Sequence, residues 1–268
     1  MAPAAPPSPA LFLHGAVALS GRFPLLAGVD LEVAIGETVL IEGPNGAGKT
    51  SLLRVCAGLV ALTSGRVSVL GLDPVRQRNR VRRRVGLLSH ASHLYDDLTV
   101  RENVRFAVRA AGADPGRIDG ACDRLGLSGR LLKTSASKLS AGQRRRAALA
   151  VLVARWPELW LLDEPHAGLD ASARQTLNEL IGEAASDGVT VVIASHEAQF
   201  VESLVTRAIT VTGGRVTDER VIGAASADTG APPTGPAPAS PVDAPPTAGP
   251  SPAGSAAGPS KVEVADVA

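Results

Sequence analysis

Several features that are typical of particular protein classes are rare in this chain. It has only two cysteines, Cys56 and Cys122, far apart and without metal-ligand spacing. A disulfide scaffold is therefore excluded, and a reducing compartment is favoured. No apolar run approaches the roughly 18 residues of a membrane-spanning helix. The formal net charge of +1 argues against a protein built mainly to hold nucleic acid, because such proteins usually carry a basic excess.

Aromatic residues are also scarce, at 3% of the chain, whereas there are 28 glycines and 20 prolines. In the segment 224–260, 31 of 37 residues are Ala, Pro, Gly or Ser, too few apolar groups to offset the entropy of ordering. We expect three regions: a disordered N-terminal segment without signal-peptide features (1–10), a folded domain (11–221) and a flexible tail (222–268). The tail is interpreted as solvated, with docking of a partner as the alternative.

Short apolar runs alternate with helical patterns through the middle of the chain. Buried strands are predicted at 38–42, 85–88, 159–162 and 189–194, and helices at 49–57, 141–155 and 171–186. This alternation is typical of an α/β domain with a mostly parallel sheet covered by helices. Such sheets bind ligands beyond the carboxyl ends of their strands.

A glycine-rich segment, GPNGAGKT at 43–50, follows the first of these strands. It fits the pattern G-x-x-x-x-G-K-[ST] with a strand before it and a helix after it. Its glycines let backbone N–H groups turn toward phosphates, and the helix directs its positive end to the same place. We predict that a nucleoside triphosphate is bound here by Gly43, Pro44, Asn45, Gly46, Ala47, Gly48, Lys49, Thr50 and Ser51. Lys49 would contact the β- and γ-phosphates, and the Thr50 hydroxyl would ligate Mg²⁺.

The segment LWLLDE at 159–164 is an apolar strand that ends in two acids. We expect it to neighbour the strand before the glycine-rich loop, so that Asp163 anchors Mg²⁺ through water. Glu164 would then lie on the γ-phosphate side and orient or deprotonate the attacking water. His196 follows the strand at 189–194, where it would contact the γ-phosphate.

Another segment, LSAGQ at 139–143, begins a long helix with Ser140 at the N-cap position. The order GPNGAGKT, LSAGQ, LLDEP, GLD and SH resembles the ATP-binding subunit of ABC transporters over about 11–221. The resemblance implies a RecA-like P-loop NTPase core of the ABC type, with antiparallel β and helical subdomains, that hydrolyses ATP with Mg²⁺. It also implies a head-to-tail homodimer, in which Ser140, Gly142 and Gln143 cap the γ-phosphate of the ATP bound by the other subunit.

The resemblance also assigns roles to single positions. Glu164 matches the catalytic glutamate, His196 the switch histidine, and Asp170 the aspartate that links the two ATP sites. His90 stands where most such subunits carry a glutamine that relays nucleotide state to the membrane partner. An imidazole can also donate and accept hydrogen bonds, but it titrates near neutrality, so the role of His90 stays open.

The family usually places an aromatic residue against the adenine base, at a position that is Ser20 in this chain. Phe23 is the only aromatic residue nearby, and it is either a substitute for that platform or a core residue. Trp156 and Trp160 flank the strand that carries Asp163 and are interpreted as packing residues.

A finer resemblance comes from IEG before the glycine-rich loop, His90, and LSAGQ followed by arginines. These features are similar to the ATP-binding subunit of the cytochrome c biogenesis haem exporter. This resemblance implies a peripheral position on the cytoplasmic face of the cell membrane and a permease partner. We expect no haem on this chain, because it has no C-x-x-C-H attachment motif, and no nucleic acid, because its net charge is near zero. The alternatives are an exporter of a drug or lipid, and a soluble ABC ATPase that acts on DNA or ribosomes.

Two arginine-rich stretches have no assigned role. Six arginines lie between Arg76 and Arg84; we interpret them as a solvated helix face, with anionic lipid or an acidic permease loop as the alternative. The three arginines at 144–146 either strengthen phosphate binding or form a surface face.

Overall fold

The computed structural model describes residues 8–222. Residues 1–7 of the expected N-terminal segment and 223–268 of the expected tail lie outside the described residues. Ala10 is fully buried, and its carbonyl accepts a hydrogen bond from the N–H of Leu70 at 2.8 Å. The N–H of Ile222 donates to the carbonyl of Thr206 at 2.9 Å. Ala10 and Ile222, which lie just outside the expected range 11–221, therefore make contacts with the folded domain.

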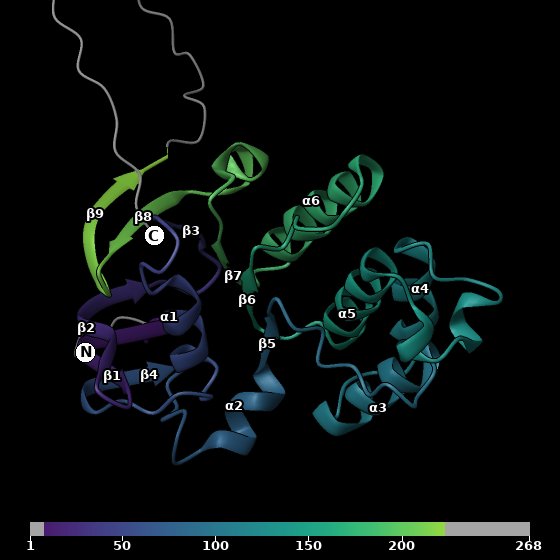
Figure 1. Ribbon diagram of the computed structural model, residues 1–268, viewed down its shortest axis with the longest axis horizontal. Coiled ribbons are helices and arrows are strands. Elements are labelled where there is room, and N and C mark those ends of the chain that lie inside the picture. Colours follow the sequence, from purple (N-terminus) through teal and green to yellow (C-terminus); the bar gives the residue numbers. More distant parts are fainter. Residues whose placement is uncertain (1–7, 223–268) are drawn as a thin grey trace, which may run out of the picture. The chain divides into compact units, whose positions relative to one another are not determined.

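The larger of two sheets has six strands in the order β5-β6-β7-β3-β8-β9 (Figure 1). Its strands are β3 (Thr38–Glu42), β5 (Val85–Leu88), β6 (Leu159–Asp163), β7 (Thr190–Ala194), β8 (Arg207–Thr212) and β9 (Arg215–Val221). All neighbouring pairs are parallel except β8 and β9. The four predicted buried strands are confirmed as β3, β5, β6 and β7, and the prediction of a mostly parallel sheet is confirmed with them.

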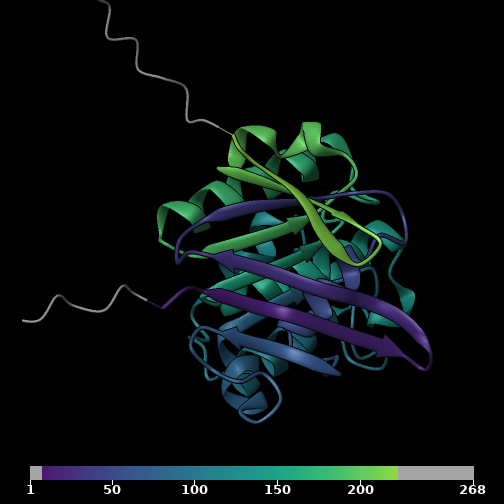
Figure 2. The ribbon, with the colours of Figure 1, turned by 90° about the vertical axis from the view of Figure 1, so that its left-hand side faces the viewer.

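A second sheet, antiparallel, has the order β2-β1-β4. It consists of β1 (Leu11–Ser20), β2 (Phe23–Val33) and β4 (Ser64–Val69), which lie side by side in Figure 2. Helix α1 (Lys49–Cys56) packs with this sheet against one face of the larger sheet. Because strand side chains alternate between faces, Val39 and Ile41 of β3 point into this core, whereas Leu40 points into the core on the opposite face.

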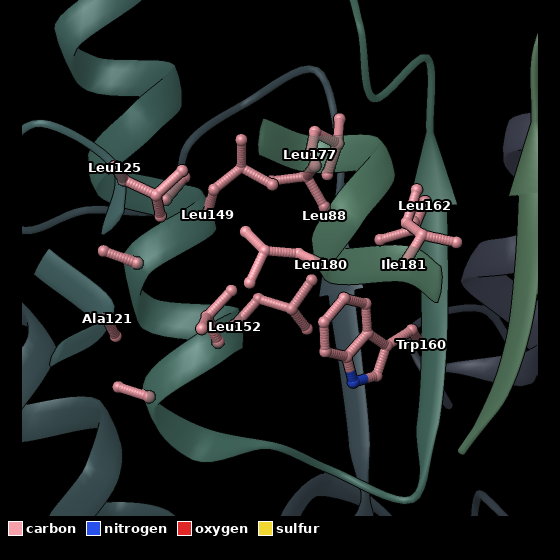
Figure 3. Packing of buried hydrophobic residues seen from close by; sticks show 14 of the residues in the cluster. Leu88, Ala121, Leu125, Leu149, Leu152, Trp160, Leu162, Leu177, Leu180 and Ile181 are labelled. Carbon is pink, nitrogen blue, oxygen red and sulfur yellow. The ribbon is translucent and has the colours of Figure 1, made fainter. Parts of the chain in front are cut away.

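That opposite face is covered by helices. Helices α5 (Ala141–Arg155) and α6 (Ala171–Ser186) lie against the sheet, and α3 (Val100–Ala111) and α4 (Arg117–Arg124) pack on α5, while α2 (Arg78–Arg84) precedes β5. Short 3₁₀ turns lie at η1 (Leu131–Lys133), η2 (Ala136–Lys138), η3 (Ala198–Phe200) and η4 (Glu202–Leu204). Figure 3 shows Trp160 of β6 among Leu152 of α5 and Leu180 of α6. Trp160 is fully buried and lies 5.4 Å from the ring of Trp156, so the interpretation of both as packing residues is confirmed.

One expectation about the larger sheet is wrong. Strand β6 does not neighbour β3, because β7 lies between them and pairs with both in parallel. Helical crossovers allow a strand from late in the chain to enter between two earlier ones. The loops that follow β3, β7 and β6 are therefore adjacent in that order at one edge of the sheet. Within residues 8–222, no helix has the length and apolar character that crossing a membrane requires.

Candidate nucleotide-binding site

The glycine-rich segment forms the turn between β3 and α1. Gly43, Gly46 and Gly48 have φ angles of 140°, 79° and 111°, which residues with a side chain rarely adopt. A Cβ atom on Gly43 would lie 2.1 Å from the carbonyl oxygen of Val211, and one on Gly48 would lie 2.9 Å from that of Leu25. Glycine is therefore required here both by the backbone conformation and by the close approach of neighbouring strands.

Lys49 is the first residue of α1 and is only 7% exposed. Its ammonium group donates to the carbonyl of Gly43 at 2.6 Å and to that of Pro44 at 3.2 Å. Because an ammonium group has three hydrogens, one remains for an anion above the turn, where the N-terminus of α1 also favours negative charge. The turn and the first turn of α1 contain the other predicted phosphate-binding residues, Pro44, Asn45, Ala47 and Ser51.

Thr50 and Asp163 meet at the same edge of the sheet. The Thr50 hydroxyl lies 3.0 and 2.9 Å from the two carboxylate oxygens of Asp163, so α1 brings Thr50 to the end of β6 although β7 separates β6 from β3. Burial raises the pKa of Asp163, and the hydrogen bond from Thr50 opposes that shift. Hydroxyl and carboxylate oxygens are the hard ligands that Mg²⁺ prefers, so these two residues fit the metal.

Glu164 is held by the loop that follows β7. Its carboxylate accepts hydrogen bonds from the Ser195 hydroxyl (3.1 Å) and the His196 N–H (3.2 Å), and it lies 2.8 Å from Nδ1 of His196. Its backbone has a left-handed φ of 46°, and its N–H donates to the carbonyl of Ala194 at 2.8 Å. The pKa of His196 is raised, mainly by the hydrogen bond to Glu164 and by its charge.

The residues expected to face a second subunit lie at two helix starts. Ser140 and Gln143 form a capping box at α5: the Ser140 hydroxyl accepts from the Gln143 N–H at 3.2 Å, and the Gln143 side chain accepts from the Ser140 N–H at 3.0 Å. A Cβ atom on Gly142 would lie 3.3 Å from the carbonyl of Gly168. Asp170 caps α6. Among residues 8–222, none of these side chains is hydrogen-bonded to the phosphate-binding turn.

His90 lies in the loop after β5 and is exposed. The loop is anchored by buried Ser89, whose hydroxyl donates to the carbonyl of Ala91 at 2.9 Å and lies 2.8 Å from Nε2 of His93. No hydrogen bond of the His90 side chain is present within the described part of the chain. Its imidazole is therefore available to a ligand or a partner.

Phe23 begins β2 and is 78% exposed. The interpretation of Phe23 as a core residue is therefore wrong, because at this end of β2 the strand carries its side chain to solvent. Ser20, the expected platform position, is its exposed partner across the β1–β2 turn.

The burial of the Arg145 side chain was not predicted from the sequence. Its guanidinium is buried and donates to backbone carbonyls at the ends of β5 and β6, so neither alternative for 144–146 describes it. Arg144 instead pairs with Asp96 at 2.7 Å, and Arg146 donates to the carbonyl of Leu125. Helical periodicity was the available signal, because position 145 shares the buried face of α5 with 148, 149 and 152.

The arginines at 76–84 are mostly exposed, which fits both a solvated face and a surface for an anionic partner. Arg84 is the exception, since it makes a two-point ion pair with Glu158 at 2.6 Å. The other arginines of this stretch are exposed: Arg76, Arg78, Arg80, Arg82 and Arg83.

A glycine-rich turn between strand and helix, with a threonine–aspartate pair beside it, defines a P-loop nucleoside triphosphatase. The family model described as ABC transporter matches residues 26–167. The Cytochrome c biogenesis ATP-binding export protein CcmA of Cupriavidus pinatubonensis is 39% identical over 183 residues, 66% of this chain and 78% of that protein. The Glutamine transport ATP-binding protein GlnQ of Escherichia coli is 35% identical over 207 residues, 74% and 86% of the two chains.

Solved structures of ABC transporter proteins have a similar fold. The dimeric structure of a bacterial ABC transporter cassette has a TM-score of 0.72 at 26% identity, covering 80% of this chain and 99% of that one. The chain belongs to the ABC transporter family. It is an ATP-binding subunit that hydrolyses ATP and depends on Mg²⁺.

Proposed function

We propose that this ATPase subunit powers a permease that exports haem for cytochrome c maturation. The support is the similarity to CcmA proteins of three organisms, at 39, 40 and 38% identity, together with His90 and the arginines after LSAGQ. Export of another compound is the second candidate, because the Daunorubicin resistance ATP-binding protein DrrA3 of Streptomyces coeruleorubidus is 35% identical over 82% of this chain. A soluble ABC ATPase without a permease is the third.

In this proposal the phosphate-binding turn holds the triphosphate of ATP. Lys49, already fixed by two carbonyls of the turn, would donate its remaining N–H to the β- and γ-phosphates. The paired oxygens of Thr50 and Asp163 would hold Mg²⁺, Thr50 directly and Asp163 through water. When bound, Mg²⁺ neutralises charge that develops on the phosphates during transfer.

Glu164 is the proposed group that orients and deprotonates the attacking water. It lies one residue beyond Asp163, and its carboxylate is aimed by Ser195 and His196 rather than left free to rotate. His196 is assigned to the γ-phosphate. Its raised pKa favours the protonated imidazole, which attracts an anion.

We further propose that the subunit acts as a head-to-tail homodimer. The start of α5 has no acidic residue in its first turn, so its positive end remains available to the γ-phosphate of the other subunit's ATP. Ser140, Gly142 and Gln143 would supply this cap, and Asp170 would face the second site.

A groove beside the His90 loop is the proposed docking surface for the permease. Its volume is about 620 Å³, and it is lined by Leu59, Tyr95 and Phe106, each about half exposed. Arg82 and Arg83 of α2 also line it. Exposed apolar side chains beside cations fit a short amphipathic helix with acidic residues. The subunit would then lie peripherally on the cytoplasmic face of the cell membrane, with His90 next to the partner.

The permease and its cargo are tested by purification of the tagged full chain from gently solubilised native membrane, followed by mass spectrometry. Recovery of a multi-spanning permease with cytochrome c assembly proteins is expected. A permease of another pathway would contradict haem export and leave the ATPase role intact. The absence of any membrane protein would favour the soluble candidate.

The role of Glu164 is tested by Glu164→Gln, with Glu158→Gln as the matched control. Glu158 lies just before β6, at the end of the strand opposite Glu164, and forms an ion pair with Arg84. Glu164→Gln should bind ATP, lose hydrolysis and accumulate as a dimer in size-exclusion chromatography with ATP. Hydrolysis by Glu164→Gln at close to the wild-type rate would contradict the assignment.

A further inference from the structure

Arg145 joins three parts of the ATP site through one buried guanidinium. It lies one turn into α5, two residues after LSAGQ, and is 8% exposed. Its Nη1 donates to the carbonyl of Ser89 at 2.6 Å, and its Nη2 donates to those of Asp163 at 3.1 Å and Glu164 at 2.5 Å. The side chain therefore connects the helix start, the loop that contains His90 and the end of β6.

All three acceptors of this buried cation are backbone carbonyls, so no carboxylate pairs directly with its charge. Burial lowers the pKa of Arg145, and the nearby charges of Asp163 and Glu164 oppose that shift. Its Nε has no hydrogen-bond partner among the described residues. Burying a charge in this way costs free energy, whereas simple packing in the same place needs only an apolar side chain.

The carbonyl of Glu164 is the most informative of the three acceptors. Glu164 has a left-handed φ of 46°, a conformation that persists in a non-glycine residue only when its surroundings hold it. Its N–H is held by the carbonyl of Ala194, and its own carbonyl is held by Arg145. Both peptide groups of Glu164 are therefore fixed, and with them the direction of its Cα–Cβ bond, from which Ser195 and His196 hold the carboxylate.

We propose that Arg145 is a positioning residue for ATP hydrolysis, which holds the backbone of Glu164 and ties it to α5 and to the His90 loop. This inference rests on the proposed role of Glu164 in activating water. Helix α5 carries at its start the residues that would cap the other subunit's ATP. One turn later it carries the cation that holds this subunit's own Glu164. In the proposed dimer, α5 would therefore connect the cap of one ATP site with the glutamate of the other.

The test is Arg145→Gln in the full chain, with Arg155→Gln as its matched control. Arg155 lies on the same helix, and its guanidinium also donates to backbone carbonyls, those of Arg82 and Val85, at the end of α5 away from the site. Arg145→Gln should lower kcat about 10- to 100-fold, as expected for a displaced catalytic group, with KM and ATP affinity nearly unchanged. Arg155→Gln should leave kcat unchanged. A wild-type kcat in Arg145→Gln, or equal losses in both variants, would overturn the proposal.

Two further variants separate positioning from folding. Arg145→Lys keeps the charge and the aliphatic stem, but one ammonium group cannot reproduce the planar fork, so its kcat should also fall while circular dichroism stays unchanged. Millimolar guanidinium should raise the kcat of Arg145→Ala and not that of Arg155→Ala. A wild-type kcat in Arg145→Lys, or no rescue of a folded Arg145→Ala, would overturn the proposal.

The proposed role of Glu164 can be refuted independently of the Arg145 proposal. If Glu164→Gln hydrolyses ATP at the wild-type rate, the proposed role of Glu164 is wrong whatever Arg145 does. If Glu164→Gln is inactive and Arg145→Gln is fully active, only the Arg145 proposal is wrong.

Discussion

Gly43→Ala tests the close approach of the phosphate-binding turn to β8. Gly43 has a φ of 140°, and a Cβ atom there would lie 2.1 Å from the carbonyl oxygen of Val211. Val211 is fully buried in β8, so its carbonyl cannot move without disturbing the pairing of β8 with β9. The turn or the strand must therefore shift by at least about 1.3 Å to restore an ordinary contact of 3.4 Å.

The expected loss of stability in Gly43→Ala has two parts. A backbone conformation that only glycine adopts easily costs about 1–3 kcal/mol in another residue, and overpacking of a tight site costs about 1–3 kcal/mol. Gly43→Ala should therefore lower the free energy of unfolding by about 2–6 kcal/mol. Gly46→Ala is the matched control, because Gly46 also has a positive φ, 79°, but nothing lies within 4 Å of its Cβ position. It should lose only the backbone part, about 1–3 kcal/mol.

The assay is urea unfolding of the full chain without nucleotide, followed by far-UV circular dichroism. The urea midpoint should fall further for Gly43→Ala than for Gly46→Ala, with the same slope in all three proteins. ATP affinity, measured in parallel, should fall for Gly43→Ala because the turn is displaced. Equal losses of stability in the two variants would refute the close-approach argument.

Three further predictions concern single side chains of the site. Lys49→Ala should abolish measurable ATP affinity in equilibrium binding, because the ammonium is the cation fixed at the turn; unchanged binding would contradict the turn's assignment. Glu164→Gln should lower the pKa of His196 toward its ordinary value of 6.5 in an NMR titration, since Glu164 is the main cause of the upward shift. Because the pKa of His196 is higher in the folded state, the stability contributed by its pair with Glu164 is complete below pH 6.5 and is lost as pH rises through the folded-state pKa. If Glu164→Gln lowered the free energy of unfolding more at pH 9 than at pH 6, this prediction would be contradicted. Ser140→Ala should cost about 1 kcal/mol of unfolding free energy by removing the acceptor of the Gln143 N–H, and no change would show that the capping box does not stabilise α5.

Local patterns in the sequence were sufficient for the elements that frame the site. The helices at 141–155 and 171–186 have the predicted bounds, and the four buried strands begin and end within one residue of theirs. Apolar runs, a capping serine and glycine-rich turns each involve only a few neighbouring residues. They can therefore be recognised in the sequence without knowledge of the fold. The same holds for the phosphate-binding turn, whose glycines are required by its own backbone angles.

The arrangement of these elements was decided only by tertiary structure. The insertion of β7 between β6 and β3 and the left-handed backbone of Glu164 each depend on residues far away in the chain. Arg145 shows this most clearly: helical periodicity places it on the buried face of α5, but the three carbonyls that its guanidinium binds lie 18 to 56 positions away in the chain. By itself the sequence determined the strands, the helices and the glycine-rich turn. Which side chains share the site was decided by long-range strand pairing and packing, which no local pattern encodes.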